Sequence, residues 1–310
     1  MKLYFAPLEG ITLPIYRNTH NEFFGRCDEY FAPFVTPTDN EKLGEKNLRG
    51  ILPEANEVKL RVQCMANSEF AVCDFSHKVK ELGYDDLNIN LGCPSATVVK
   101  KGKGSGALKD LSRLCEFLDY IFKNSKTKIS LKTRTGFSSH GEFDKILEVY
   151  KKFPVSELIV HPRIRDEFYK GTPTMADFDL AYRTLNVPLC YNGDIFDKKD
   201  FVDINEKYPD LSAVMIGRGA IKNPAIFREI KGGKALTTDE LVGFSKELEK
   251  RYFALFQSPV YTLQKMKEVW NYSILNYPDC EKIAKALKKS KTLDEFNNAV
   301  NCLPEIKTQS

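Results

Sequence analysis

The sequence predicts an α/β fold, specifically a (β/α)8 TIM barrel followed by a small C-terminal helical domain. Short apolar or β-branched runs recur eight times, the segments between several of them place apolar residues at helical intervals, and polar residues stand at the ends of the runs. The 310 residues suffice for such a barrel, which commonly takes about 250. Polar groups at several strand ends favour a closed barrel over an open sheet, which concentrates its site at one switch point.

The candidate strands alternate with helical segments, as expected for parallel strands joined by crossover helices. The strands are predicted at Leu3–Ala6, Phe31–Thr36, Lys59–Gln63, Asp86–Asn90, Lys128–Thr133, Glu157–His161, Val187–Tyr191 and Ala213–Ile216. Helical spacing predicts helices at Ser68–Leu82, Leu111–Phe122, Glu142–Phe153 and Lys198–Lys207. The connections after the first two strands are less regular.

The pattern changes near residue 231, where a Lys-Gly-Gly-Lys turn begins and strand-like runs cease. Thr237-x-x-Glu240 and Thr292-x-x-Glu295 each fit a capping box at a helix start. Apolar periodicity predicts amphipathic helices over Leu241–Phe256 and Leu263–Leu275. We therefore expect a catalytic barrel domain at residues 1–230 and a helical domain at residues 235–310.

Composition excludes several classes of protein. The first residues lack the basic and apolar segments of a signal peptide, and no apolar run approaches the roughly 18 residues of a membrane helix. The eight cysteines are scattered without the spacing of a zinc site. We therefore expect a cytoplasmic protein with no metal and no membrane partner, and a monomer as its simplest state.

A glycine-rich loop carries a cysteine at the end of the fourth candidate strand. Residues 88–95 read N-I-N-L-G-C-P-S, and residues 100–106 read K-K-G-K-G-S-G. The glycines let the loop approach a ligand closely, and Pro94 restricts the backbone just after the thiol of Cys93. By itself, Cys93 is either a functional thiol over the barrel mouth or an inert loop residue.

The pattern N-x-N-x-G-C-P-S followed by K-x-G-x-G-S resembles the signature of the tRNA-dihydrouridine synthases. The resemblance covers the predicted barrel and continues through Ala6-Pro7-Leu8-Glu9-Gly10, Val62-Gln63, Leu131-Lys132-Thr133-Arg134-Thr135-Gly136, Val160-His161, Asn192-Gly193-Asp194-Ile195 and Ile216-Gly217-Arg218-Gly219-Ala220. The helical tail matches the family only in type.

The resemblance implies an FMN prosthetic group reduced by NADPH and a uridine in the D-loop of tRNA as substrate. It implies hydride transfer from flavin N5 to C6 of the uridine and proton donation from the Cys93 thiol to C5. A thiol is mostly protonated at neutral pH and can serve as a general acid.

Most candidate site residues lie where predicted strands end. The cofactor-binding candidates are Pro7, Leu8, Glu9, Gln63, Lys132, His161, Asn192, Gly193, Asp194, Gly217 and Arg218, and the substrate-binding candidates are Asn90, Arg134 and Lys100. The loops at residues 192–194 and 217–219 follow the seventh and eighth strands, where barrels commonly bind phosphate.

Each polar candidate has a structural alternative. Lys132 can stabilise the negative charge of reduced flavin, or be a solvated strand-end lysine. Arg134 is expected to contact the ribose phosphate or the substrate, or to form a salt bridge. Gln63 suits a flavin pyrimidine edge and Asn90 the uracil, unless they cap loops. His161 contacts the flavin phosphate or ring by resemblance, or is a satisfied core histidine.

Two departures from the family pattern stand near these residues. Pro162-Arg163 follows His161 where the family often has Gly-Arg, which stiffens the backbone there, and Leu8 replaces a commoner methionine. Neither departure touches Cys93, Lys132 or the glycine loops.

The resemblance implies tRNA as the partner, and the basic residues suit an acidic partner. Residues 231–310 carry three more basic than acidic side chains, and the whole chain has a net charge of +4. The candidate RNA-binding lysines are Lys100, Lys101, Lys103, Lys282, Lys285, Lys288, Lys289 and Lys291; the alternative for each is an ordinary solvated surface. Two other functions stay open: a flavin-dependent reductase of a free pyrimidine, and a non-catalytic RNA-binding barrel.

Overall fold

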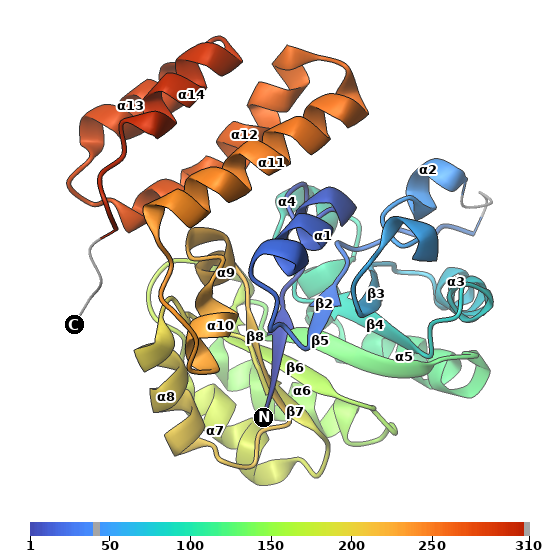
Figure 1. The fold of residues 1–310 in the computed structure, drawn as a ribbon. Coiled ribbons are helices and arrows are strands. Elements are labelled where there is room, and N and C mark those ends of the chain that lie inside the picture. The colour runs from blue at the N-terminus through green and yellow to red at the C-terminus, as the bar shows by residue number, and fades with distance from the viewer. Residues whose placement is uncertain (40–43, 307–310) are drawn as a thin grey trace.

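The computed structural model describes residues 1–39 and 44–306. Eight parallel strands form a closed barrel in which each strand pairs with its sequence neighbours and β1 closes on β8 (Figure 1). The strands are β1 (Lys2–Phe5), β2 (Glu29–Phe31), β3 (Leu60–Cys64), β4 (Asp86–Leu91), β5 (Lys128–Gly136), β6 (Leu158–Ile164), β7 (Leu189–Tyr191) and β8 (Ala213–Ile216). The predicted TIM barrel is confirmed.

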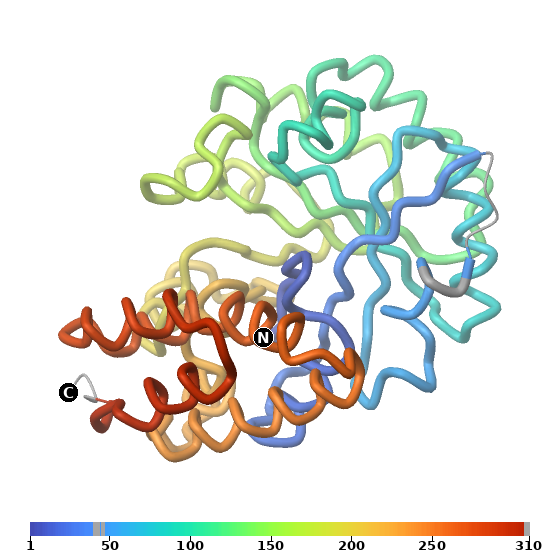
Figure 2. Tube along the Cα trace, turned by 90° about the horizontal axis from the view of Figure 1, so that it is seen from above, coloured from blue at the N-terminus to red at the C-terminus, as the bar shows by residue number. Residues whose placement is uncertain are grey.

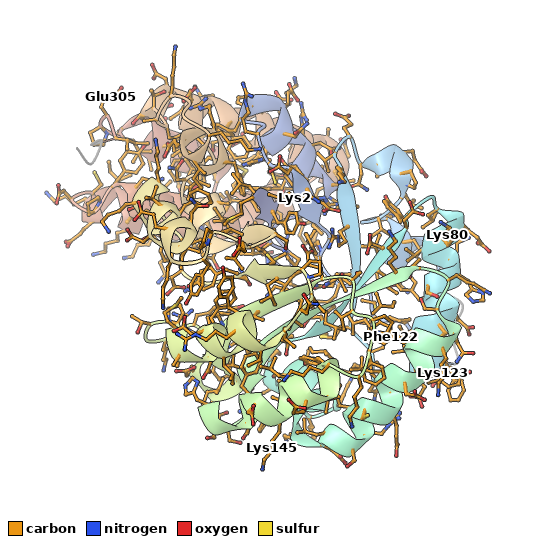
Figure 3. The ribbon with its side chains drawn as sticks, turned by 90° about the horizontal axis from the view of Figure 1, so that it is seen from below. Lys2, Lys80, Phe122, Lys123, Lys145 and Glu305 are labelled. Carbon is orange, nitrogen blue, oxygen red and sulfur yellow. The ribbon has the colours of Figure 1, made fainter. Side chains whose placement is uncertain are left out.

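Helices surround the strands on the outside. They are α1 (Pro14–Phe23), α2 (Glu45–Leu48), α3 (Glu69–Glu81), α4 (Ala96–Val99), α5 (Leu111–Asn124), α6 (Phe143–Tyr150), α7 (Met175–Thr184), α8 (Lys198–Lys207), α9 (Arg218–Lys222) and α10 (Ile226–Ile230). Figure 3 shows Lys80, Lys123 and Lys145 pointing outward from this layer, whereas Phe122 stacks on Phe153 with ring centroids 5.3 Å apart. The four helices predicted in this layer are all present.

The predicted bounds of the second strand were wrong. The strand covers Glu29–Phe31 rather than Phe31–Thr36. Pro33 has no N–H for a ladder hydrogen bond, and Val35 forms only an isolated bridge with Cys64. The sequence pattern did not indicate a strand at Glu29, because a charged residue is unusual in a buried strand unless it is paired.

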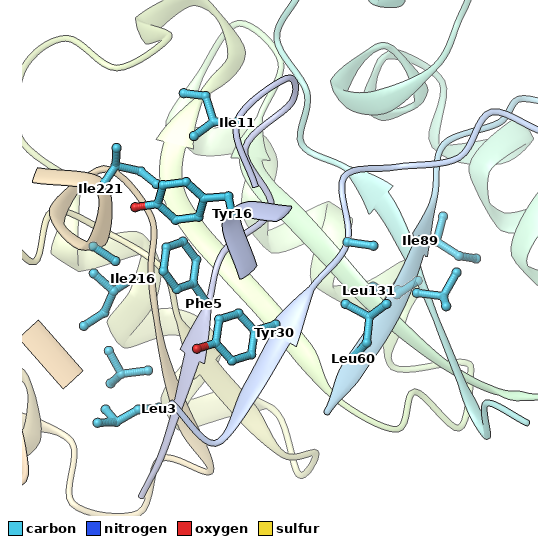
Figure 4. Close-up of a cluster of buried hydrophobic side chains, with 14 of the residues drawn as sticks. Leu3, Phe5, Ile11, Tyr16, Tyr30, Leu60, Ile89, Leu131, Ile216 and Ile221 are labelled. Atoms are coloured by element: carbon cyan, nitrogen blue, oxygen red, sulfur yellow. The ribbon is translucent and has the colours of Figure 1, made fainter. Parts of the chain in front are cut away.

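Alternate strand residues face opposite sides of the barrel wall. Leu3 and Phe5 face outward into the main hydrophobic core under the helices, where Phe5 stacks on Tyr30 at 5.5 Å (Figure 4). Tyr4 and Ala6 belong to a smaller apolar cluster completed by Phe31, Ile159, Cys190, Ala213 and Met215. This two-residue period sets which side chains reach the interior.

A buried ionic network lies at the amino-terminal end of this interior. Arg61 Nη2 is 2.8 Å from Glu29 Oε2, and Arg61 Nη1 is 2.5 Å from Glu157 Oε2. The Tyr4 hydroxyl donates to Glu157 at 3.0 Å, and the Arg61 guanidinium lies 5.0 Å from the centre of the Phe31 ring. The two carboxylates hold the pKa of Arg61 above its ordinary value despite burial.

Up to residue 306, the barrel is followed by the α-helices α11 (Thr238–Phe256), α12 (Pro259–Ser273), α13 (Glu281–Lys289) and α14 (Leu293–Asn301). Thr237 and Glu240 form the predicted reciprocal capping box. At α14 only half of the predicted box forms, because Thr292 accepts from the amide of Glu295 while the Glu295 carboxylate accepts from Lys291 N.

The C-terminal helices pack on one side of the barrel, beside its first and last units (Figure 2). The ring centroid of Phe244 in α11 lies 5.6 Å from that of Tyr16 in α1 and 5.2 Å from that of Phe24, just after α1. Lys265 Nζ of α12 donates to Gly10 O at 2.9 Å. Trp270 of α12 is buried and donates from Nε1 to Ser245 Oγ at 2.8 Å. Helix α12 therefore contacts the β1–α1 loop at the barrel mouth.

A non-helical connection at residues 231–237 separates α10 from α11, in agreement with the predicted turn. The domain boundaries at residues 230 and 235 stay a prediction, and residues 307–310 of the predicted helical domain lie outside the described residues. Among residues 1–39 and 44–306, no helix is both long enough and apolar enough to cross a membrane.

Candidate active site

A cavity of about 320 Å³ opens at the carboxyl ends of the strands. Every predicted site residue except Lys100 lines it. The full lining is Ala6, Pro7, Leu8, Glu9, Ile11, Pro33, Phe34, Gln63, Asn90, Gly92, Cys93, Pro94, Lys132, Arg134, His161, Tyr169, Asn192, Gly193, Asp194, Gly217, Arg218 and Tyr272. Lys100 is an exposed residue directly after α4.

The period of the strands explains why these residues meet. Inward positions two residues apart carry Lys132 and Arg134 on β5, and His161 and Arg163 on β6. Since parallel strands end at the same rim of the barrel, the last inward side chains converge there.

A chain of side-chain amides orients the cysteine loop. Asn88 donates to Ser130 Oγ at 2.9 Å, Gln63 donates to Asn88 Oδ1 at 2.8 Å, and Asn90 donates to Gln63 Oε1 at 2.9 Å. The Oδ1 atom of Asn90 then accepts from the backbone amides of Gly92 and Cys93, at 3.0 and 2.9 Å. Asn90 therefore fixes the backbone that presents the thiol, and its own orientation is set by Gln63.

The loop after Cys93 folds back onto it. Ser105 donates to Cys93 O from both its amide and its hydroxyl, at 3.1 and 2.9 Å. Gly104 has φ of +56°, and a Cβ there would lie 2.8 Å from Cys93 O and 2.9 Å from Cys93 Cβ. Only glycine fits this position, which keeps the Cys93 backbone in place beside the cavity.

Positive charge gathers on the cavity wall at Lys132, Arg134 and Arg218. A fourth cation, the fully buried Arg163, lies behind the lining with its Nη1 atom 3.1 Å from His161 Nε2. Burial, together with the charge of Arg134, lowers the pKa of Lys132 to about 8. Burial, reinforced by all four cations, lowers the pKa of His161 well below its ordinary value, so the imidazole is neutral. Within the described residues the side-chain ammonium of Lys132 has neither an ion pair nor a hydrogen bond. This wall is suited to an anionic ligand.

The Arg134 side chain forms hydrogen bonds with the protein backbone. Its guanidinium donates to the carbonyl oxygens of Gly92, Ile164 and Phe168, at 2.9, 2.8 and 2.5 Å. It thus joins the cysteine loop to the loop after β6. This contact is neither the ligand contact nor the salt bridge that the sequence suggested, although Arg134 also lines the cavity.

The loops after β7 and β8 lie against each other. Asp194 pairs with Arg163 at 2.5 Å and with Arg218 at 2.6 Å, and Asn192 donates to Met215 O at 2.8 Å. A Cβ at Gly219 would lie 1.9 Å from Ile195 O, so only glycine allows this contact. Within residues 1–39 and 44–306, the backbone amides of Gly193, Asp194 and Gly217 have no acceptor. These N–H groups suit an anion such as a phosphate.

Two tyrosines of the lining escaped the sequence analysis. Tyr169, in the loop after β6, is 54 % exposed, and the guanidinium carbons of Arg218 and Arg134 lie 4.8 and 5.5 Å from its ring centre. Tyr272 comes from α12. A loop aromatic and a helix aromatic carry no local signal of a site, because only the fold brings them to the barrel rim. Glu9, also at the rim, has a pKa raised by burial.

The described part of the chain contains no group of three or more His, Cys, Asp or Glu side chains that could hold a metal ion. The polar lining of the cavity instead combines a thiol, amides and cations with two carboxylates, a histidine and two tyrosines.

Comparison with known proteins assigns the chain. The model of the family described as "Dihydrouridine synthase (Dus)" matches residues 4–305. The chain belongs to the dihydrouridine synthase family. A probable tRNA-dihydrouridine synthase of Staphylococcus aureus (strain COL) is 30% identical over 261 residues, which covers 81% of this chain and 76% of the relative. One of Helicobacter pylori (strain J99) is 27% identical over 311 residues, covering 99% and 89%.

Solved structures agree in fold. A variant of NCR from Zymomonas mobilis matches with a TM-score of 0.52 at 11% identity, covering 76% of this chain and 88% of that one. Morphinone reductase in complex with tetrahydroNAD matches with a TM-score of 0.51 at 8% identity and the same coverage. At these identities the likeness extends to the fold alone. Membership of the dihydrouridine synthase family makes the chain an oxidoreductase.

Proposed function

We propose that this family member is an FMN-dependent tRNA-dihydrouridine synthase that uses NADPH to reduce the C5–C6 double bond of a uridine in the tRNA D-loop. Cys93 is the proton donor. The observation that carries the proposal is the cavity itself, which brings Cys93 together with a lysine and backbone amides that have no partner among the described residues. A monomeric, cytoplasmic enzyme is the simplest form of this proposal.

The residues of the cavity fit FMN. The cation wall and the free amides of Gly193, Asp194 and Gly217 suit its phosphate, with Arg218 beside them. Lys132 suits the electron-rich pyrimidine side of an isoalloxazine, and Gln63 offers an amide to the same edge. Pro7, Leu8, the neutral His161, Glu9 and Asn192 also line the cavity and would supply the remaining contacts.

The chemistry divides between the cofactor and the chain. When bound, FMN supplies the hydride that goes to C6 of the uridine. The Cys93 thiol donates a proton to C5, and the Asn90 and Ser105 hydrogen bonds to its backbone hold it at the cavity. Asn90 and Arg134 border the space left for a uracil ring.

A uridine must leave the base stack to enter this cavity. Lys100 and Lys101, both exposed beside α4, and the exposed lysines of α13 suit the phosphates of a tRNA lying across the barrel mouth. The D-loop and the preference for NADPH follow the family resemblance.

The decisive experiment is mass spectrometry of tRNA incubated with the protein, FMN and NADPH. We expect a gain of two hydrogens on a mapped uridine. Reduction of free uracil but not of tRNA would favour the free-pyrimidine alternative. A colourless protein that binds tRNA and cannot be reconstituted with FMN would favour the non-catalytic one.

The variant Cys93→Ala should keep the bound yellow cofactor and lose turnover by about 10²- to 10⁴-fold, because a general acid contributes that much. The measurement is the rate of dihydrouridine formation at matched flavin content. Cys302→Ala is the control, since Cys302 is exposed after α14. Unchanged turnover of Cys93→Ala would remove Cys93 from its role.

A further inference from the structure

Arg163 has every N–H of its guanidinium satisfied inside the protein. Its Nε donates to Lys170 O at 3.1 Å, Nη1 donates to His161 Nε2 at 3.1 Å and to Asp194 Oδ1 at 3.0 Å, and Nη2 donates to Gly171 O at 2.7 Å and to Asp194 Oδ2 at 2.5 Å. The side chain is 0 % exposed. These five acceptors match the five donors of a guanidinium, so Arg163 has one orientation.

This arrangement decides which nitrogen of His161 carries the proton. A guanidinium has no lone pair to offer, so His161 Nε2 must be the acceptor of the bond from Arg163. A neutral imidazole with an accepting Nε2 carries its hydrogen on Nδ1. Within the described residues Nδ1 has no acceptor, and His161 lines the cavity.

The charges around the ring keep it neutral. Lys132 and Arg134 face it from β5, Arg163 from β6 and Arg218 from the loop after β8, and each lowers the pKa of His161 in addition to burial. Asp194, after β7, is shared by Arg163 and Arg218. The Tyr169 ring lies 6.1 Å from the imidazole. Within the described residues, no carboxylate forms a hydrogen bond or an ion pair with the His161 ring.

We propose that Arg163 is a positioning residue that holds His161 as the neutral Nδ1–H tautomer, so that His161 presents a neutral hydrogen-bond donor to an oxygen or nitrogen acceptor of the group bound in the cavity. A neutral donor orients the acceptor without adding a charge to a site where four cations already act on His161. Because Arg163 also binds Lys170 O and Gly171 O, it holds the loop that carries Tyr169. The tautomer follows from the protein alone; its use by the bound ring rests on the proposed function.

The test is two-dimensional NMR of the full-length protein labelled with ¹⁵N-histidine, with and without added FMN. The signals of His161 are assigned by their loss in His161→Asn. We expect a protonated Nδ1 and an unprotonated Nε2, unchanged from about pH 8 to about pH 5, where an ordinary histidine becomes charged. A protonated Nε2, or an imidazolium above about pH 6, would overturn the proposal.

The variant Arg163→Lys removes the guanidinium fork and keeps the positive charge. We expect mixed tautomers of His161 in this variant, and at least about a tenfold loss in FMN affinity by fluorescence titration, as for lost outer-shell partners. Arg113→Lys is the matched control, because Arg113 lies on α5 and binds Glu69 at the surface. A folded Arg163→Lys protein with the wild-type His161 spectrum would also overturn the proposal.

The two proposals fail separately. If no flavin binds, the spectrum of the FMN-free protein still tests the tautomer. If Arg163→Lys does not fold, the wild-type spectrum is sufficient, because a hydrogen on Nε2 contradicts the proposal without any variant.

Discussion

Lys132 differs from its three arginine neighbours in lacking a partner. Arg134, Arg163 and Arg218 bind carbonyl oxygens or Asp194, whereas Lys132 has no such contact in the described part of the chain. A partly buried cation without a partner costs stability, and the lowered pKa of Lys132 expresses that cost. Such a residue is expected where an anionic ligand compensates the charge, which agrees with the place proposed for the flavin.

The variant Lys132→Met should therefore raise the free energy of unfolding of the FMN-free protein at neutral pH, by about 1–3 kcal/mol. The folded-state pKa of about 8 lies below the ordinary 10.5, so the unfolded chain binds more protons between these values. The stability of the wild type then rises with pH in that window, and the advantage of the variant disappears above it.

Urea unfolding at several pH values measures this difference. Lys128→Met is the matched control, since Lys128 is exposed at the start of the same strand. An advantage of Lys132→Met that persists above pH 10.5 would show that the gain comes from packing rather than from charge.

Sequence reasoning located most of the cavity residues because a strand end is a local signal. Gln63, Lys132 and His161 each end an apolar run, and parallel strands end at one rim. Tyr169 and Tyr272 were missed because neither lies on a strand. The contacts of Arg134 and Arg163 were missed for another reason: their acceptors are backbone carbonyls and an aspartate of other loops, and no sequence pattern gives their positions.

The contact between the loops after β7 and β8 depends on the absence of a side chain at Gly219. Gly219→Ala should destabilise the protein by about 1–3 kcal/mol and weaken FMN binding, because the new methyl group would overlap the backbone oxygen of Ile195. Thermal unfolding and flavin titration measure the two effects.

Gly243→Ala is the matched control for that substitution. Gly243 lies inside α11, and a methyl group there meets only the Phe23 side chain at 3.8 Å, so we expect a gain of about 0.5–1 kcal/mol. Equal stability of the two variants would contradict the close contact of the loops.

Helix prediction succeeded where caps and periodicity agreed. Ser68, Asp197 and Thr237 each accept from a backbone amide at the start of their helix. Strand prediction failed at β2, because three residues are too few to show a period and one of them is a glutamate. The partner of Glu29 is Arg61, 32 residues away, and such a pairing is settled only by the closed barrel.

At the scale of the molecule, the Glu29–Arg61–Glu157 network joins β2, β3 and the start of β6. Arg61→Met should lower the free energy of unfolding by about 3–5 kcal/mol, because two carboxylates would stay buried without their cation. Flavin content per folded molecule should not change, since the network lies at the opposite end of the barrel from the cavity.

Chemical denaturation measures this loss, with Arg113→Met as the control. The ion pair of Arg113 is surface-exposed and is expected to contribute less than about 1 kcal/mol. A loss of similar size in both variants would mean that the buried network does not stabilise the barrel.

Binding of tRNA should depend on which face of the molecule loses charge. Replacing Lys100 and Lys101 by Gln should weaken binding and lower the slope of log affinity against log salt by about 0.7–0.9 per lost phosphate contact. Lys123→Gln with Lys145→Gln, on the outer helices seen in Figure 3, should leave the slope unchanged. Filter binding at several salt concentrations decides, and equal slopes for both pairs would place the RNA elsewhere.

The buried Trp270 and a bound flavin would report optically on two different parts of the molecule. Trp270 is the one tryptophan of the chain and lies among the C-terminal helices, against Ser245 and Phe296, whereas a bound flavin would absorb and emit from the barrel mouth. Because α11 and α12 are anchored to α1 and to Gly10, indole emission and flavin emission should change at one temperature on heating. Two separate transitions would instead reveal that the barrel and its helices melt as independent bodies.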